Sequence, residues 1–183
     1  MTMSTIEIKK IGITKLDTDA IVNAANEGLR AGGGVCGAIF AEAGHQRLQE
    51  ACDKVGHCKT GSAVITPAFD LPAKYVIHAV GPIWRGGDQG EAKLLYSAYY
   101  QALELAVING CESIAFPLIS SGIFGYPVEQ AWEVAFRACR DFLKQNYEIS
   151  IRIIFAVLKD EMVEMGNRIL EKVGGEVLPS NAS

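Results

Sequence analysis

Hydrophobic and polar positions change their period along the chain, which predicts strands alternating with helices. Polar and apolar residues alternate over Thr5–Ile11, and a short apolar run follows at Ala20–Asn23; both patterns are typical of strands. Strand composition returns at Ser62–Pro67, Tyr75–Val80, Ser113–Pro117 and Ile151–Leu158. The last of these segments is almost continuously apolar, which predicts a central strand covered on both faces.

Apolar residues at helical spacing occupy the stretches between these strands. They predict helices over Ala38–Ala43, His45–Val55, Glu91–Asn109 and Asp160–Val173, and one that begins at Pro127. We expect Ser62–Pro67 and Tyr75–Val80 to pair as neighbours, because a short turn separates them. The mixed order of strands and helices predicts an α/β fold, arranged as a three-layer α/β/α sandwich.

Length and composition narrow the class of protein. The 183 residues suffice for a single domain, which we assign to residues 1–178, with residues 179–183 as a frayed tail. Lys and Arg number 17 against 21 Asp and Glu, so a net charge of −4 argues against binding bulk nucleic acid. No apolar run approaches the roughly 18 residues that a membrane span requires. Five cysteines, odd in number and irregular in spacing, are typical of reduced thiols in a cytoplasmic protein.

Two glycine-rich segments are candidates for a phosphate site. Gly32, Gly33, Gly34 and Gly37 cluster just before a predicted helix, whose free N–H groups favour an anion. The segment Ser120–Gly125 repeats this arrangement after the strand Ser113–Pro117. Each segment alone could be a tight turn and nothing more. Together they favour a diphosphate held by backbone dipoles, in an acidic protein that lacks spare cations.

Other chemistry in the sequence leaves alternatives open. Asn23 and Asn26 end a predicted strand beside the first glycine segment, and their amides suit either vicinal sugar hydroxyls or a turn. The glycines also satisfy G-x-G-x-x-G, which would suit a redox nucleotide enzyme, but the preceding strand ends too far back for that turn. Cys52, His57 and Cys58 match no standard zinc spacing, and we predict no metal. His78 is expected to be a hydrogen-bonded core residue.

Four motifs, taken together, resemble a macrodomain over about residues 6–170. They are DAIVNAAN at Asp19–Asn26, GGGVCGAI at Gly32–Ile39, HAVGP at His78–Pro82 and SGIFGYP at Ser121–Pro127. They are most similar to the branch that hydrolyses O-acetyl-ADP-ribose and mono-ADP-ribosylated proteins. The resemblance implies a mixed sheet between helices, a cleft for ADP-ribose or a derivative, and no further cofactor. An ADP-ribosylated protein is the implied macromolecular partner.

The same resemblance implies roles for individual residues. Asn26 would bind the distal ribose, and Gly33, Gly34 and Val35 would border that ribose and the phosphates. The diphosphate would lie within the second segment, formed by Ser120, Ser121, Gly122, Ile123 and Phe124, with Phe124 against the distal sugar. The backbone N–H of Ile13 would meet the adenine edge, and Leu158 stands where an aromatic residue often stacks on that base.

The chain departs from the pattern of this branch at four positions. Cys36 replaces the aspartate thought to orient the attacking water, and Phe40 replaces the histidine that follows it. Gly12 stands where an aspartate commonly accepts a hydrogen bond from adenine, and Leu158 lacks the aromatic ring. Loss of a charge-assisted hydrogen bond of about 1.5 to 3 kcal/mol would weaken adenine discrimination. The ribose and phosphate half of the site is therefore the better supported one.

Cys36 decides between two functions that the sequence leaves open. Its thiol could be a nucleophile at a helix N-terminus, a weak substitute for the aspartate, or a small side chain packed under the loop. Hydrolysis without a carboxylate remains available if a diphosphate oxygen of the substrate holds the water and Asn26 and the two segments position the groups. The alternative is a binding module that recognises ADP-ribose without turning it over.

Overall fold

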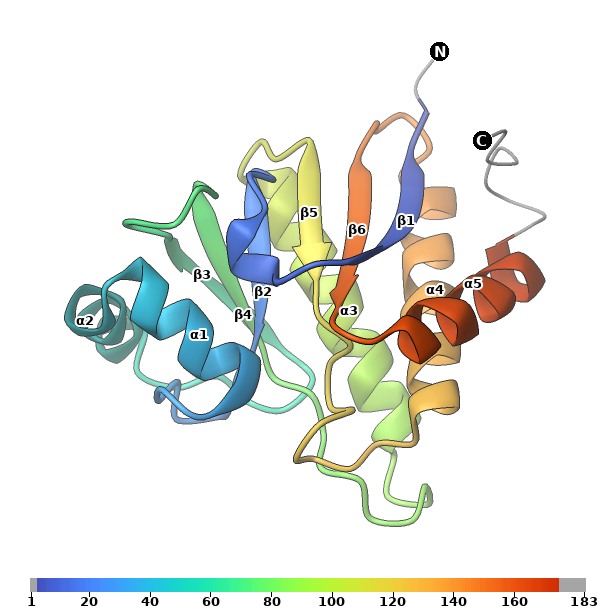
Figure 1. Ribbon diagram of the computed structural model, residues 1–183, viewed down its shortest axis with the longest axis horizontal. Coiled ribbons are helices and arrows are strands. Elements are labelled where there is room, and N and C mark those ends of the chain that lie inside the picture. Colours follow the sequence, from blue (N-terminus) through green and yellow to red (C-terminus); the bar gives the residue numbers. More distant parts are fainter. Residues whose placement is uncertain (1–2, 175–183) are drawn as a thin grey trace.

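The computed structural model describes residues 3–174 and arranges them in three layers around a central sheet (Figure 1). The six strands follow the spatial order β1-β6-β5-β2-β4-β3. Their bounds are β1 Thr5–Lys10, β2 Ala20–Ala24, β3 Ala63–Pro67, β4 Tyr75–Ala79, β5 Ser113–Phe116 and β6 Arg152–Val157. Neighbouring strands run parallel except for β3, which is antiparallel to β4 at one edge. The predicted mixed sheet and the pairing of these two strands are confirmed.

Helices cover both faces of the sheet (Figure 1). One face carries α1 (Gly34–Ala43) and α2 (His45–Val55), and the other carries α3 (Glu91–Ile108), α4 (Val128–Gln145) and α5 (Asp160–Gly174). A short 3-10 turn spans Ile13–Lys15 after β1. The predicted three-layer sandwich is therefore confirmed, whereas the predicted tail at 179–183 lies outside the described residues. None of the helices between residues 3 and 174 is long and apolar enough to cross a membrane.

Alternate residues of the central strands enter two separate cores. In β6, Ile153 and Phe155 face the core under α3, α4 and α5, whereas Ile154 and Ala156 face the core under α1 and α2. Because both faces are covered, neither set of side chains meets solvent, which explains the continuous apolar run in the sequence. The parallel strands β2, β5 and β6 all end at the same edge of the sheet, where ligands of open α/β sheets bind.

Aromatic side chains fill the core between the sheet and α4. The ring of Phe155 lies 5.3 to 5.4 Å from the rings of Phe116, Trp132 and Phe136, measured between centroids. Phe155 is fully buried, so its removal leaves a cavity that these large rings cannot easily fill.

The Phe155→Ala substitution is expected to lower the free energy of unfolding by about 3 to 5 kcal/mol, measured by urea denaturation. Ile108→Ala is the control, because Ile108 is 78% exposed and its truncation should change stability by less than about 0.5 kcal/mol. Equal effects of the two substitutions would contradict the assignment of this core.

Candidate functional site

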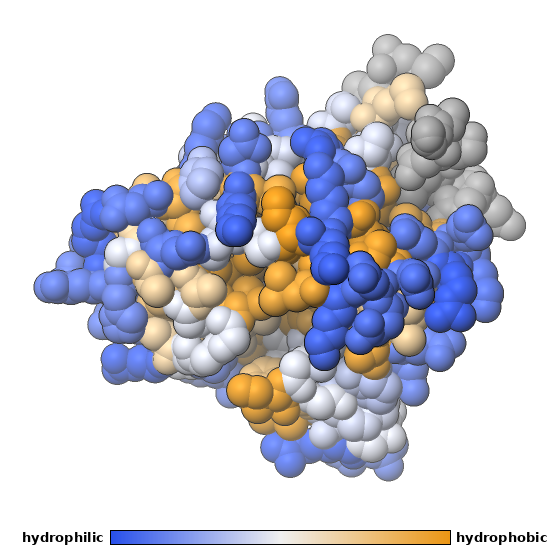
Figure 2. All heavy atoms as spheres, in the orientation of Figure 1, coloured by the Kyte–Doolittle hydropathy of each residue, from blue (hydrophilic) through white to orange (hydrophobic). Residues whose placement is uncertain are grey.

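A cavity of about 580 Å³ opens where β2, β5 and β6 end. Its walls come from the segments before α1, after β5 and before α5, so three distant parts of the sequence meet there. Figure 2 shows apolar surface gathered in the centre of this face, with polar residues around it. The predicted site residues that line the cavity are Asn26, Gly33, Gly34, Val35, Cys36, Ser120, Ser121, Gly122, Ile123, Phe124 and Leu158.

The first glycine segment forms the N-terminus of α1 instead of a loop that ends at Ala38. The helix begins at Gly34, four residues earlier than predicted, with Gly33 as the extended N-cap and Gly34 at φ +56°. Gly37 donates the first hydrogen bond of this turn, to the Gly33 carbonyl at 3.1 Å. The N–H groups before Gly37 therefore have no partner within the helix. They are available to an anion in the cavity, where the helix dipole also favours negative charge.

Gly37 is needed for this geometry. A Cβ atom at this position would lie 2.5 Å from the carbonyl oxygen of Gly32, a distance that real Cβ atoms do not adopt. The obstacle is backbone, which cannot swing aside as the end of a side chain would. The glycine therefore lets the segment fold back over the first turn of α1.

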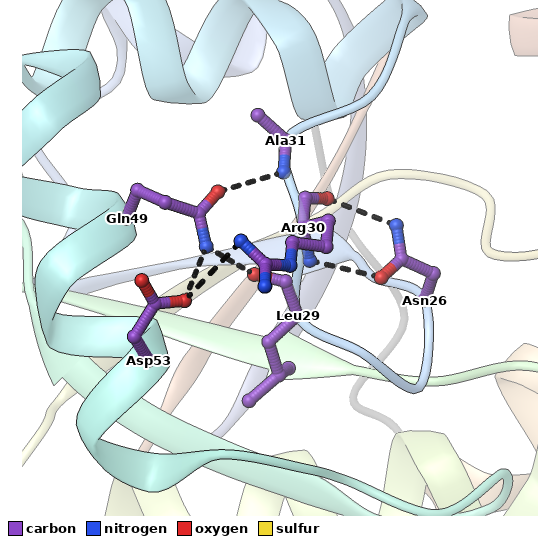
Figure 3. Close-up of polar contacts among 6 residues, drawn as sticks. All are labelled: Asn26, Leu29, Arg30, Ala31, Gln49 and Asp53. Atoms are coloured by element: carbon purple, nitrogen blue, oxygen red, sulfur yellow. Dashed lines mark hydrogen bonds and ion pairs between the residues drawn. The ribbon is translucent and has the colours of Figure 1, made fainter.

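Asn26 lies at the edge of the cavity with its amide held on both sides (Figure 3). Its Nδ2 donates to the Arg30 carbonyl and its Oδ1 accepts from the Arg30 N–H, both at 2.9 Å. A side-chain amide has two hydrogens and two acceptor lone pairs, so one of each remains unused. Asn26 is thus fixed in orientation and can still offer a donor and an acceptor to a pair of sugar hydroxyls.

Cys36 packs beneath the same segment. Its side chain is buried, borders the cavity, and directs Sγ to the Arg30 carbonyl at 3.8 Å. Among the described residues, no histidine or carboxylate forms a hydrogen bond with this thiol. The ring of His45 instead packs against the ring of Phe40, with 5.8 Å between the ring centroids. Of the three interpretations of Cys36, the geometry favours the packed side chain.

The second glycine segment follows β5 and forms the opposite wall. Ser121 Oγ donates to the Leu118 carbonyl at 2.7 Å, and the Tyr126 N–H donates to the Ser120 carbonyl at 2.9 Å, which closes the loop. Gly81 lies beneath it, where a Cβ atom would collide with the Ser120 hydroxyl and come within 2.6 Å of Ile119. The loop therefore takes its position by close contact with the segment after β4.

A buried carboxylate supports this second loop from behind. Glu91, the first residue of α3, accepts hydrogen bonds from the backbone N–H groups of Arg85 (2.9 Å), Gly87 (2.9 Å) and Gln89 (2.6 Å). Burial alone would raise the pKa of Glu91, but these N–H groups lower it to about 2. The loop ordered in this way presents the Trp84 N–H to the Phe124 carbonyl at 2.8 Å.

Sequence reasoning missed this role of Glu91. The only signal was an acidic residue in the first turn of a predicted helix, which usually stays in solvent. The aromatic ring of Trp84 adds a second link, because it packs against Tyr126 with a centroid distance of 4.7 Å. Both aromatic residues therefore act behind the wall, and neither lines the cavity.

A lysine also borders the cavity, which corrects the expectation that no cation would be available. Lys159 follows Leu158 after the end of β6, and its backbone carbonyl accepts the N–H of Met162 at the start of α5. The side chain is exposed and forms no ion pair with a described residue. A signal existed in the sequence, since Lys159 immediately follows a predicted central strand.

Ile13 and Leu158 occupy the region assigned to the base. Leu158 is 68% exposed and lines the cavity, so it offers apolar contact without a stacking ring. Ile13 begins the 3-10 turn, and its buried side chain packs in the core under α1 and away from the cavity lining. The hydrogen bond from its backbone N–H to adenine stays a prediction.

His78 belongs to a buried polar chain beneath the first segment. Asn23 Nδ2 donates to His78 Nδ1 at 3.1 Å, while His78 Nε2 lies 3.0 Å from Thr66 Oγ1. Because an amide nitrogen only donates, this arrangement places the ring hydrogen on Nε2 and keeps the imidazole neutral. Burial lowers the pKa of His78 to about 4. The expected core histidine is therefore what the structure contains.

The cysteines near the hydrogen-bonded residues around His78 do not form a metal site. Cys52 Sγ lies 3.7 Å from His78 Nε2, and burial together with the charge of Asp53 raises the pKa of this thiol to about 11. Cys58 directs its thiol to the Lys59 carbonyl. Within residues 3–174, no group of three or more His, Cys, Asp or Glu residues could hold a metal ion.

The sequence of this chain is similar to those of known proteins. The sequence model of the macro domain family matches residues 22–135. A macro domain-containing protein of Chlorobaculum tepidum is 49% identical over 161 residues, which are 88% of this chain and 92% of the relative. An O-acetyl-ADP-ribose deacetylase of Citrobacter koseri is 46% identical over 177 residues, covering 94% of this chain and 99% of that enzyme.

Solved structures agree with these sequence matches. A macrodomain of Oceanobacillus iheyensis with ADP superimposes with a TM-score of 0.89 at 35% identity, covering 95% of this chain and 94% of the other. A Trypanosoma brucei macrodomain in complex with ADP-ribose gives a TM-score of 0.82 at 36% identity, covering 90% of this chain and 68% of the other.

Protonation of His78 should destabilise the fold in acid. The unfolded chain takes up this proton near pH 6.5 but the folded protein only near pH 4, so the histidine's contribution to stability is lost as the pH falls through this window. We expect a loss of about 3 kcal/mol in the free energy of unfolding between these pH values, measured by urea denaturation. His78→Gln should reduce that slope, whereas the exposed His57→Gln should not; equal slopes would contradict the assignment.

Proposed function

The chain belongs to the macro domain family, and we propose that its cavity binds ADP-ribose or an ADP-ribose derivative. The observation that carries this proposal is the meeting of two glycine segments across one cavity, with Asn26 at its edge. The Citrobacter koseri relative is an O-acetyl-ADP-ribose deacetylase, and the Oceanobacillus iheyensis and Trypanosoma brucei macrodomains have been solved with ADP and with ADP-ribose. The volume, the amide donors and the polar side chain together suit a nucleoside diphosphate joined to a second sugar.

The diphosphate would lie between the N-terminus of α1 and the second segment. Amides at Gly34 and Val35 and the helix dipole favour negative charge there, and amides of Ser121–Phe124 approach from the other wall. Asn26 would bind the distal ribose, with Phe124 against the sugar. Leu158 would give the base apolar contact only, so we expect a weaker preference for adenine than a stacking aromatic ring would give.

The proposed reaction is hydrolysis of an ester on the distal ribose, either in O-acetyl-ADP-ribose or in a mono-ADP-ribosylated protein. The water oxygen bonds to the ester carbon, the bond from that carbon to the ribose oxygen breaks, and a water proton passes to the ribose oxygen. The side chains that line the cavity in the described part of the chain include no Asp, Glu or His. A diphosphate oxygen of the substrate therefore holds the water, and the protein contributes positioning.

The second candidate is an ADP-ribose reader without turnover. The absence of a carboxylate from the lining and the packing of Cys36 against the Arg30 carbonyl favour this alternative. Both functions need the same binding site, so binding and hydrolysis are tested separately.

Calorimetry with the full chain tests binding. ADP-ribose should bind more tightly than ADP, and at least about tenfold more tightly than AMP, because AMP reaches neither the second phosphate nor Asn26. Equal affinities for AMP and ADP-ribose would contradict the proposal.

A separate assay tests hydrolysis: the protein is incubated with O-acetyl-ADP-ribose and with mono-ADP-ribosylated protein, at a protein concentration comparable to that of the substrate. Both substrates remaining intact would reject hydrolysis and leave the reader.

Cys36→Asp tests whether the missing carboxylate limits the rate. A carboxylate at this place could orient the water, so hydrolysis should rise by roughly tenfold or more, within the usual contribution of a positioned base. Cys36→Ser is the matched control, since it keeps a donor for the Arg30 carbonyl and adds no charge. A gain of equal size in both variants would point to a packing effect.

Lys159→Met tests the contribution of the cation at the edge of the cavity. Its loss should weaken ADP-ribose binding by roughly threefold to tenfold in low salt, and the difference should shrink as salt screens the charge. Lys172→Met is the control, because Lys172 lies in the last turn of α5, at the opposite end of the helix from Lys159, which precedes its first residue. Equal losses for the two variants, or a loss independent of salt, would show that Lys159 acts otherwise.

A further inference from the structure

Helix α2 holds the segment that joins Asn26 to the first glycines (Figure 3). Gln49 reaches it with both ends of its side-chain amide: Nε2 donates to the Leu29 carbonyl and Oε1 accepts from the Ala31 N–H, each at 3.0 Å. Nε2 also donates to Asp53 Oδ1, one turn further along α2, at 3.0 Å. The side-chain amide of Gln49 is therefore held in place by Asp53 and forms hydrogen bonds with the backbone on both sides of Arg30.

The segment needs such support because its backbone is unfavourable. Leu29 adopts φ +56°, a region that a leucine rarely occupies, and its side chain is 1% exposed. A strained residue of this kind persists only where its surroundings determine its conformation. Burial of the side chain supplies one restraint, and the hydrogen bond from Gln49 to the Leu29 carbonyl supplies another.

The backbone of Arg30 connects Gln49 with Asn26 at the edge of the cavity. Its backbone N–H and carbonyl are the two groups that hold the Asn26 amide. They belong to the same two peptide groups that Gln49 holds, because the Leu29 carbonyl shares one peptide group with the Arg30 N–H and the Arg30 carbonyl shares the next with the Ala31 N–H. A shift of either peptide group would therefore turn Asn26 as well. The Arg30 side chain adds a weaker link to α2, with Nη1 3.8 Å from Asp53 Oδ1.

We propose that Gln49 is a positioning residue for Asn26, and through it for recognition of the distal ribose. Gln49 does not line the cavity, so it acts only through the backbone of Arg30. The inference rests on the proposed function, because it assigns Asn26 to the ribose that distinguishes ADP-ribose from ADP. A ligand without that ribose should be insensitive to Gln49.

A double-mutant cycle with two ligands tests this inference. Calorimetry of the full chain with ADP-ribose and with ADP compares the wild type, Gln49→Met, Asn26→Ala and the double variant. We expect Gln49→Met to lower the affinity for ADP-ribose by about tenfold and the affinity for ADP by less than about twofold. The tenfold loss corresponds to one or two hydrogen bonds that position Asn26. In the Asn26→Ala background the same substitution should have no further effect on ADP-ribose.

Gln46→Ala is the matched control. Gln46 lies on the same helix, is exposed, and bonds to Glu50 on its own helix. Its loss should leave both affinities unchanged. Gln49→Glu is a second variant if Gln49→Met fails to fold, since it keeps the acceptor for the Ala31 N–H and removes the donor to the Leu29 carbonyl; it should weaken ADP-ribose selectively as well.

The outcomes separate the inference from the proposed function. Equal weakening of ADP-ribose and ADP, a lower melting temperature with unchanged affinities, or an undiminished effect in the Asn26→Ala background would each overturn the positioning role. In all of these cases the wild type still prefers ADP-ribose, and the proposed function stands. A wild type that binds neither ligand would reject the proposed function itself.

Discussion

Close approach at two glycines fixes the walls of the cavity. At Gly37 the first turn of α1 meets the Gly32 carbonyl, and at Gly81 the segment after β4 meets Ser120 and Ile119. Neither contact leaves room for a side chain, and both set the position of backbone that faces the cavity. The obstacle at Gly37 is backbone and the obstacles at Gly81 are the side chains of Ser120 and Ile119, so the arrangement of amide donors depends on close packing at both glycines.

Anion binding by backbone amides already occurs inside this protein. Glu91 is buried against three N–H groups and forms no ion pair with a residue in the described part of the chain, and those N–H groups lower the pKa of its carboxyl to about 2. The binding that we propose for the cavity relies on the same chemistry for an external anion, with Lys159 at the edge as an additional charge. Such backbone donors would favour a diphosphate locally even though the net charge of the protein is −4.

The sequence predicted the layers well because buried strands and helices have strong periodic patterns. The two glycine segments and the asparagine at a strand end indicated where a ligand site would form, and the resemblance to a family supplied the individual residues, of which all but Ile13 line the cavity. The start of α1 was wrong by four residues, because helix propensity disfavours the glycines that begin it. Gln49, Glu91 and Lys159 were missed for a different reason: each is a polar residue on or beside a helix, and such residues usually face solvent.

The two walls of the cavity have separate anchors. The wall with Asn26 is attached to α2 on one face of the sheet, whereas the wall with Phe124 is attached to the loop that precedes α3 on the other face. The two walls are thus held by different outer layers of the sandwich. A molecule that spans the cavity would contact both walls and so connect the layer of α2 with the layer of α3.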